Sequence, residues 1–228
     1  MREIELLTFG DSNTYGYKPD GSGRFEKEIR WSGILSEKLK GKFHVIEEGL
    51  CGRTTVFEDE TRIGRKGSDL LPVLLESHEP VGVVLLMLGT NDMKKRNHAT
   101  AKDIGAGIEI LLDQIAESER KSGVKKRVLL ISPIHLGENI EAFDKDFSNE
   151  AIAVSYELAR EYKKIAQKRK IDFLNAADYV EPSMLDREHF DANSHLKFAE
   201  VVYRKLKEMK ISRENEWEAE AFSKEYVS

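Results

Sequence analysis

The sequence predicts a three-layer α/β/α sandwich built around a five-stranded parallel sheet. Short apolar runs bounded by Gly, Pro or Asp alternate with longer segments whose apolar residues recur at helical spacing. One of these runs, Val81–Leu88, is apolar at every position except Gly82, as expected for a central strand with helices on both faces. In open sheets of this kind, ligands bind outside the carboxyl ends of the strands.

Five apolar runs account for the strands, and five segments of helical period account for the helices that cover them. The predicted strands are Ile4–Phe9, His44–Glu48, Val81–Leu88, Arg127–Ser132 and Ile171–Asn175. The predicted helices are Trp31–Leu39, Ser68–His78, Lys102–Ser122, Asn149–Lys170 and Ser194–Met209. Ser68 and Asp69 provide the second of these helices with a suitable N-terminal cap.

The chain of 228 residues is expected to form one domain over residues 1–210, because no internal repeat or Pro/Ser-rich linker divides it. Residues 211–228 form a charged extension in which Trp217, Phe222 and Tyr226 are spaced as one stripe of a helix. We expect this extension to be helical. It would dock either on the domain or on a second subunit, and the second alternative would make the protein a homo-oligomer.

The composition excludes several classes of protein and partner. With 40% hydrophobic residues, the chain has too much apolar content for a disordered protein. Its 36 Lys and Arg residues against 41 Asp and Glu give a net charge of −5, so we expect neither nucleic acid nor an anionic membrane as a partner. One cysteine and six scattered histidines fit no disulfide and no metal site of known spacing.

The apolar runs and the N-terminal residues also predict a location. The longest runs fall far short of the roughly 20 apolar residues that a membrane span needs. Acidic residues interrupt the first run and no small-residue cleavage site follows, so we expect no signal peptide and a cytoplasmic protein.

A serine follows the first predicted strand. It stands in the run Gly10-Asp11-Ser12-Asn13, on a tight turn that the glycine permits. Taken alone, this run is better explained as a turn that Asp11 and Ser12 cap. The ends of the other strands change that interpretation.

The second and third strands bring hydrogen-bond donors to the same edge of the sheet. They end in Glu-Glu-Gly49 and Gly-Thr-Asn91-Asp92, and neighbouring strand ends converge in a parallel sheet. The backbone N–H groups of Ser12 and Gly49 and the side-chain amide of Asn91 would form three uncharged donors aimed at one point. A developing oxyanion requires such donors.

A carboxylate and an imidazole come late in the chain, in Asp186-Arg-Glu-His189. This spacing lets Asp186 accept a hydrogen bond from one ring nitrogen of His189 while the other nitrogen faces a serine. His189 would then act as the general base for Ser12. We expect Asp11 and Asp92 to brace the strand-end loops by accepting backbone N–H bonds.

These elements, in this chain order, resemble the SGNH (GDSL) hydrolase superfamily, whose name denotes the Ser, Gly, Asn and His that are here Ser12, Gly49, Asn91 and His189. The resemblance runs from Ile4 to about Leu206. Four longer segments are similar to its arylesterase/acyltransferase branch: Phe-Gly-Asp-Ser-Asn-Thr-Tyr-Gly-Tyr, Arg30-Trp31, Val-Ile-Glu-Glu-Gly-Leu with Arg53-Thr54-Thr55, and Met-Leu-Gly-Thr-Asn-Asp-Met-Lys.

The resemblance implies a flavodoxin-like fold and a serine esterase that hydrolyses short-chain, acetyl-like esters through an acyl-Ser12 intermediate. The implied catalytic residues are Ser12, Asp186 and His189, and the implied oxyanion hole is Ser12, Gly49 and Asn91. Some members of the branch pass the acyl group to alcohols or hydrogen peroxide. None of these steps requires a metal or an organic cofactor, and the implied partner is a small-molecule ester.

Six residues are candidates for the substrate pocket: Asp11, Tyr15, Trp31, Arg53, Phe143 and Phe147. Tyr15 stands where this branch can carry a tryptophan, a difference that bears on pocket polarity. Trp31 is equally explained as core, and Arg53 either gates the pocket or pairs with Glu47, Glu48 or Asp59. Phe143 and Phe147, one helical turn apart, form a pocket wall or a packing stripe.

Two other residues attract attention without fitting the chemistry. Cys51 has no Asp-x-x-His partner of its own, and small buried cysteines are common. His195 is expected to start the final helix rather than to act as a base.

Other functions remain open at this point. A carbohydrate acetylesterase would share the same four motifs and differ in pocket shape. From another class, a flavodoxin-like binding module would hold a phosphate in the loop 8–14. A phosphotransfer enzyme would use Asp11 as nucleophile and depend on magnesium, and an inactive relative would act through the C-terminal stripe.

Overall fold

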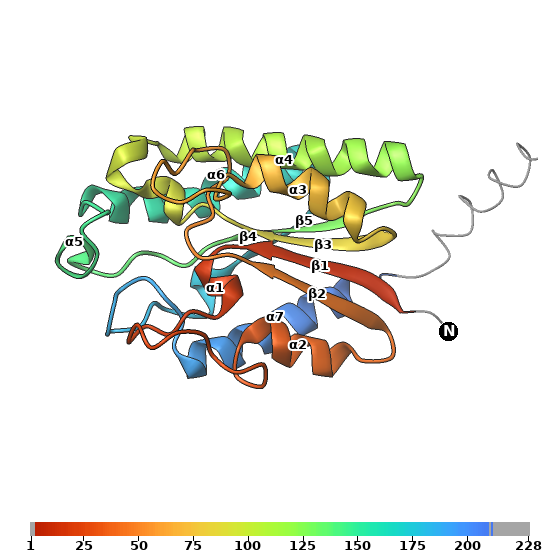
Figure 1. The fold of residues 1–228 in the computed structure, drawn as a ribbon, viewed down its shortest axis with the longest axis horizontal. Coiled ribbons are helices and arrows are strands. Elements are labelled where there is room, and N and C mark those ends of the chain that lie inside the picture. The colour runs from red at the N-terminus through yellow and green to blue at the C-terminus, as the bar shows by residue number, and fades with distance from the viewer. Residues whose placement is uncertain (1–2, 210, 212–228) are drawn as a thin grey trace, which may run out of the picture.

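One parallel sheet forms the centre of the protein in the computed structural model, which describes residues 3–209 and 211 (Figure 1). Its strands are β1 (Ile4–Gly10), β2 (Phe43–Gly49), β3 (Val81–Met87), β4 (Arg127–Ser132) and β5 (Asp172–Asn175), in the order β2-β1-β3-β4-β5. All neighbouring strands are parallel, which confirms the predicted sheet. Because β2 and β3 lie on opposite sides of β1, the strand order reverses at β1. Open α/β sheets commonly bind ligands at such a switch point.

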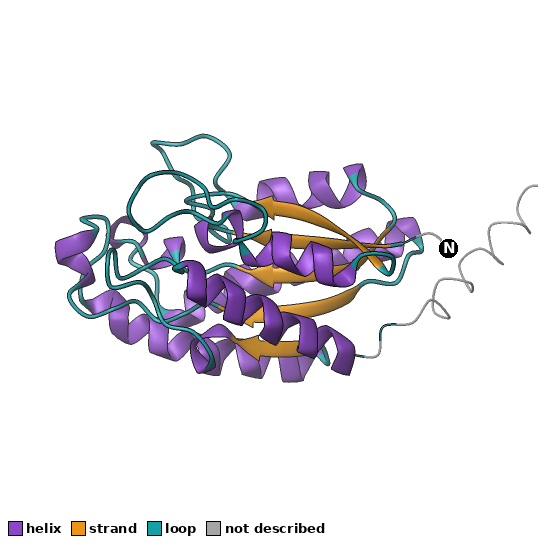
Figure 2. Ribbon diagram, turned by 90° about the horizontal axis from the view of Figure 1, so that it is seen from below, coloured by secondary structure: helices purple, strands orange, loops and turns teal. Residues whose placement is uncertain are grey.

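Helices cover both faces of the sheet and form the predicted outer layers (Figures 1 and 2). One face carries α3 (Gly67–Ser77), α4 (Ala101–Ser122) and α6 (Glu150–Arg169), and the other carries α2 (Trp31–Leu39) and α7 (Ala192–Glu208). Shorter elements lie in the loops: α1 (Ser12–Tyr15), α5 (Ile140–Phe143), η1 (Asn91–Met93), η2 (Lys95–Asn97) and η3 (Ala176–Asp178).

Each face of the sheet has its own hydrophobic core. Because side chains alternate along a strand, Leu7 and Phe9 of β1 pack toward α3, α4 and α6. Leu6 instead packs with Trp31 of α2 and Phe198 of α7. Burial of both faces specifies the strand register, and the register aligns the strand ends that carry the site.

The predicted boundaries differ from the observed ones by at most two residues. The cap predicted at Ser68 is wrong, because α3 begins at Gly67 and has no side-chain cap. The N–H groups of Gly67 and Ser68 donate to the carbonyl oxygens of Thr54 and Thr55, at 3.0 and 2.9 Å. Backbone acceptors from a neighbouring loop thus satisfy this helix end, so no capping side chain is needed.

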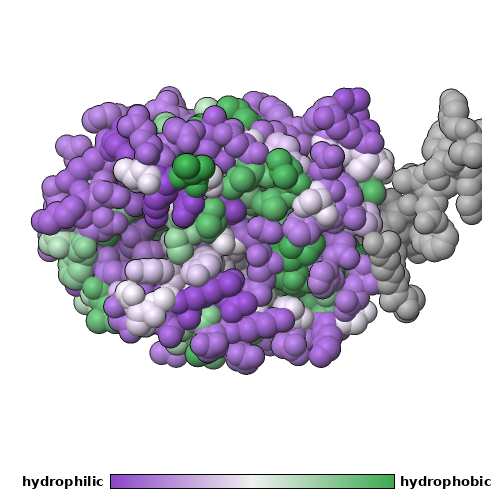
Figure 3. All heavy atoms as spheres, viewed as in Figure 1, coloured by the Kyte–Doolittle hydropathy of each residue, from purple (hydrophilic) through white to green (hydrophobic). Residues whose placement is uncertain are grey.

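Among the described residues, no helix combines the length and the apolar character of a membrane span. The face of the molecule seen in Figure 3 is mostly hydrophilic, with its hydrophobic groups in separate patches. The extension predicted at 211–228 lies outside the described residues, apart from Ile211, which is buried against the core of the α2 and α7 face.

Candidate active site

Ser12 stands at the carboxyl end of β1, as the first residue of the one-turn helix α1. The Asp11 side chain accepts a hydrogen bond from the Asn13 N–H at 3.0 Å and caps this turn. The turn closes at Gly16, which has a φ of 84° and donates its N–H to the Ser12 carbonyl at 2.9 Å. The Ser12 hydroxyl is therefore held at the edge of the sheet by a short turn with a hydrogen bond at each end.

Ser12, His189 and Asp186 form one continuous chain of hydrogen bonds. His189 Nε2 lies 2.8 Å from Ser12 Oγ, and His189 Nδ1 lies 2.7 Å from Asp186 Oδ2. The other carboxylate oxygen of Asp186 accepts the backbone N–H groups of Glu188 and His189 at 3.1 and 3.0 Å. The carboxylate therefore fixes both the imidazole ring and the turn that carries it.

Asn13, which the sequence interpretation missed, ties this turn to the serine. Its Nδ2 donates to the Glu188 carbonyl at 3.2 Å, and its Oδ1 accepts the Phe190 N–H at 2.8 Å. The peptide groups on both sides of His189 are thus bonded to the residue next to Ser12. The ring of Tyr17, also missed, lies 4.8 Å from the imidazole, centroid to centroid.

The predicted oxyanion donors come from three neighbouring strand ends. Gly10, two residues before Ser12, pairs with Gly49 on one side and with Met87 on the other. Asn91 opens the turn η1 after β3, and its Nδ2 donates one hydrogen to the Arg53 carbonyl at 3.2 Å. The second hydrogen of that amide is not used in this bond.

Charges around the imidazole favour its protonated form. Burial by itself lowers the pKa of His189, but the carboxylates of Glu188, Asp186 and Asp11 reverse this effect and raise it. Burial by itself would raise the pKa of Asp186. The hydrogen bond and the charge of His189 outweigh this effect, so the pKa of Asp186 is lowered. The pair therefore favours an ionised carboxylate beside an imidazole that accepts a proton readily.

Asp11 and Asp92 brace the loops as predicted. Both oxygens of Asp92 accept the Thr55 N–H, at 3.0 and 3.1 Å, and Oδ1 also accepts the Thr55 hydroxyl. Burial, assisted by the charge of Asp11, raises the pKa of Asp92 to about 7. Burial likewise raises the pKa of Asp11. Two neighbouring carboxyl groups thus lie beneath the site with reduced tendency to ionise.

Four of the six pocket candidates have buried side chains: Asp11, Trp31, Arg53 and Phe147. Trp31 is only 1% exposed and donates its indole N–H to the Asn13 carbonyl at 3.0 Å. It belongs to the core and supports the nucleophile turn from below.

Among the described residues, Arg53 pairs with none of the carboxylates considered for it. Its guanidinium lies 4.2 Å from the Phe9 ring centroid and donates to the carbonyl oxygens of Gly10 and Glu48. Burial lowers its pKa to about 10. Arg53 therefore joins the ends of β1 and β2.

Two pocket candidates keep an accessible surface. Tyr15 is half-buried, and its ring lies 4.4 Å from the Arg24 guanidinium carbon. Phe143 is 47% exposed, with the guanidinium of Arg187 at 5.3 Å. Phe147 instead packs in the core, so the predicted Phe143 and Phe147 pair does not form a common wall.

Cys51 and His195 are removed from the chemistry, as expected. Burial raises the pKa of the Cys51 thiol to about 11, which disfavours a nucleophilic thiolate. His195 is buried in α7, accepts the Trp31 N–H at Nδ1 over 3.2 Å, and has a pKa lowered to about 3 by burial. Neither residue is hydrogen-bonded to the Ser12 hydroxyl, which is bonded to His189.

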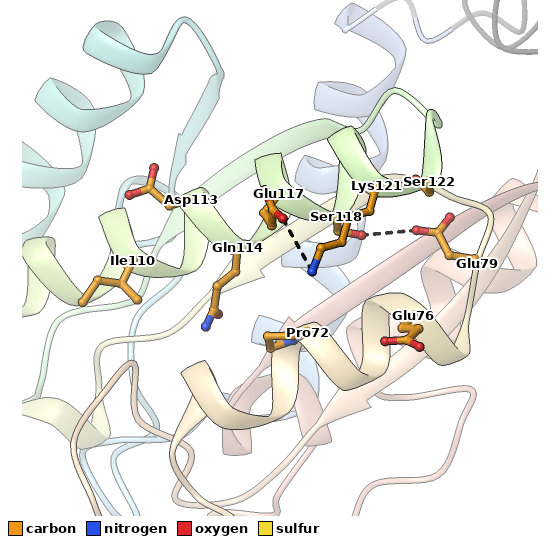
Figure 4. Close-up of a pocket in the computed structure, with 10 residues that line it drawn as sticks. All are labelled: Pro72, Glu76, Glu79, Ile110, Asp113, Gln114, Glu117, Ser118, Lys121 and Ser122. Atoms are coloured by element: carbon orange, nitrogen blue, oxygen red, sulfur yellow. Dashed lines mark hydrogen bonds and ion pairs between the residues drawn. The ribbon is translucent and has the colours of Figure 1, made fainter. Parts of the chain in front are cut away.

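A separate cavity of about 820 Å³ lies between α3 and α4 (Figure 4). Its lining includes Glu76, Glu79, Glu117 and Lys121, and none of the three residues of the hydrogen-bonded chain. In the part of the chain that the structure describes, no cluster of three or more His, Cys, Asp or Glu is arranged to hold a metal ion.

Comparison with known proteins agrees with this geometry. The sequence profile of the GDSL-like Lipase/Acylhydrolase family matches residues 8–202. Among curated proteins no match was found. Many solved structures match, and three of those that are similar over about nine-tenths of the chain are compared below.

The native aryl esterase of M. smegmatis is 33% identical, with a TM-score of 0.85, covering 90% of this chain and 99% of that one. Est24, a carbohydrate acetylesterase from Sinorhizobium meliloti, is 32% identical, with a TM-score of 0.85 and coverages of 91% and 100%. A putative arylesterase from Agrobacterium tumefaciens is 29% identical, with a TM-score of 0.82 and coverages of 90% and 99%. The chain therefore belongs to the GDSL-like lipase/acylhydrolase family of SGNH hydrolases and is a carboxylic ester hydrolase.

Proposed function

We propose that the protein hydrolyses short-chain esters, above all acetyl esters, through an acyl-Ser12 intermediate. The observation that carries this proposal is the hydrogen-bonded chain from Ser12 Oγ to His189 Nε2 at 2.8 Å and from His189 Nδ1 to Asp186 at 2.7 Å. Ser12 and His189 are themselves largely buried, which favours a small acyl group.

His189 takes the proton of Ser12 as the oxygen attacks the ester carbonyl, and Asp186 stabilises the imidazolium. The N–H groups of Ser12 and Gly49 and the amide of Asn91 hold the oxyanion, each contributing roughly 3 kcal/mol. The imidazolium then protonates the leaving alcohol. Water, activated by His189, releases the acid and restores Ser12, and an alcohol or hydrogen peroxide in place of water would give acyl transfer.

A carbohydrate acetylesterase is the second candidate, supported by the similarity to Est24. It uses the same residues on an acetylated sugar. A phosphate-binding loop at 8–14 has less support, because the Ser12 hydroxyl is bonded to His189 and Asp11 places a carboxyl group under the loop.

The test is the release of p-nitrophenol from p-nitrophenyl acetate by the wild type, Ser12→Ala and His189→Ala. We expect an active wild type and a loss of several orders of magnitude in each variant. Equal rates in three folded proteins would overturn the proposal. Acetyl, butyryl and octanoyl esters then test chain length, and a preference for octanoyl would contradict the short-chain assignment.

A further inference from the structure

Glu188 brings a second carboxylate to the catalytic imidazole. Its Oε1 lies 3.8 Å from His189 Nε2, the same nitrogen that bonds to Ser12. The residue is only 6% exposed. Asp186 already holds the opposite ring nitrogen, so the orientation of the imidazole does not depend on Glu188.

The backbone of Glu188 is fully bonded, but its carboxylate is not. The N–H donates to Asp186 and the carbonyl accepts from Asn13. No described residue donates a hydrogen bond to the carboxylate, and the nearby cation Lys94 bonds to Asp146 instead, at 2.9 Å. The carboxylate oxygens are nevertheless not fully enclosed, unlike Oδ2 of Asp11.

A largely buried carboxylate without a donor is costly. Burial raises the pKa of Glu188; the charges of His189 and Lys94 oppose this effect, and those of Asp144 and Asp186 add to it. A hydrogen-bond donor supplied by a substrate would offset the cost of burial.

The position of Glu188 indicates which part of a substrate would supply that donor. The leaving oxygen of an ester must approach His189 Nε2 to receive its proton. A hydroxyl or ammonium on the carbon next to the alkoxy carbon then comes within reach of Glu188 Oε1, whereas a carboxylate there is repelled.

We propose that Glu188 contacts the substrate and selects esters whose alcohol portion carries a hydroxyl or ammonium donor beside the ester group. This inference rests on the proposed function and narrows it to one substrate class. Acylated polyols and protonated amino alcohols both present this donor, and esters of neutral alkanols do not.

The experiment compares kcat/KM for two acetates of similar size, 2-hydroxyethyl acetate and n-propyl acetate, in the wild type, Glu188→Gln and Glu188→Leu. The ratio of the two values cancels any general effect on His189. We expect the wild type to prefer the hydroxyl ester about tenfold or more, and Glu188→Leu to lose this preference. Glu188→Gln, which keeps a neutral acceptor, should retain part of it.

Two further substrates distinguish the source of the donor. The 2-(dimethylamino)ethyl ester tests an ammonium, and acetoxyacetate tests an anion. A preference for the ammonium that Glu188→Gln abolishes assigns the site to amino alcohols, and a preference confined to the hydroxyl ester assigns it to polyols. We expect Glu188→Gln to raise kcat/KM for acetoxyacetate relative to n-propyl acetate. Such a rise supports a negative charge of Glu188 that faces the alcohol portion of the substrate.

The control is Glu157→Gln, on the exposed surface of α6, which should leave all ratios unchanged. A wild-type ratio near one, or a ratio that Glu188→Leu does not change, would overturn the inference. The proposed function is tested separately, by whether Ser12→Ala loses the hydrolysis of both acetates that the wild type shows.

Discussion

Gly49 lies directly against the backbone of Tyr15, so that a Cβ at position 49 would stand 2.6 Å from the Tyr15 Cα and closer still to its nitrogen. That nitrogen donates to the Asp11 carbonyl at 2.8 Å and belongs to the turn that presents Ser12. Glycine at the end of β2 is therefore required by close packing, quite apart from the oxyanion contact proposed for its N–H.

Gly49→Ala should shift the nucleophile turn. We expect kcat for p-nitrophenyl acetate to fall about a hundredfold, and the free energy of unfolding in urea to fall by about 1–3 kcal/mol. Gly105→Ala is the matched control, because its Cβ would meet a movable side-chain carbon of Glu161 at 2.9 Å. Wild-type kcat in Gly49→Ala would refute the packing argument.

Asn13→Ala should loosen the turn that carries His189. Loss of the bonds to Glu188 and Phe190 leaves two buried backbone groups unpaired, at a cost of about 2–4 kcal/mol in unfolding free energy. We expect kcat to fall by at least tenfold with a smaller change in KM. Asn175→Ala, which removes an exposed bond to Asp178, serves as control, and equal effects of the two changes would argue against the clamp.

The acid side of the pH–activity profile should report His189. As a base it must be neutral, so kcat/KM falls as pH drops through its pKa, which lies above the ordinary value of about 6.5. Removing the charge of Glu188 in Glu188→Gln lowers that pKa and moves this side of the profile to lower pH. An unmoved profile would show that Glu188 does not act on His189.

Asp92 should make the protein more stable in mild acid. Its pKa is raised from 3.8 to about 7 in the fold, so the folded state binds the extra proton between these values. The free energy of unfolding should fall as pH rises from 4 to 7, by on the order of 2–4 kcal/mol at about 1.4 kcal/mol per pKa unit.

Asp92→Asn should remove most of that slope in urea titrations at pH 4, 5.5 and 7, because the amide cannot ionise. Asp69→Asn, an exposed change on α3, is the control. A slope that persists in Asp92→Asn would assign it to other groups.

Several features of the site were predictable because local chemistry determines them. The apolar run of β3, the glycine before Ser12 and the three-residue spacing of Asp186 and His189 depend on neighbours along the chain. Parallel pairing then places Gly10, Gly49 and the residues after β3 together. The family resemblance rested on these same residues.

Other features could be recognised only in the folded structure, because contacts between distant segments determine which side chains are buried and which hydrogen-bond partners they have. The positions of Trp31 and Arg53 along the chain do not reveal that both side chains lie beneath the nucleophile turn. Nor does the sequence reveal that Asn13 holds the chain on both sides of His189, or that the Glu188 carboxylate reaches His189 Nε2 without a donor of its own. Periodicity and local spacing along the chain were enough to predict the fold class and the residues available for catalysis. Which polar groups find a partner within the protein depends on packing across the sheet edge, and that packing is visible only in the folded structure.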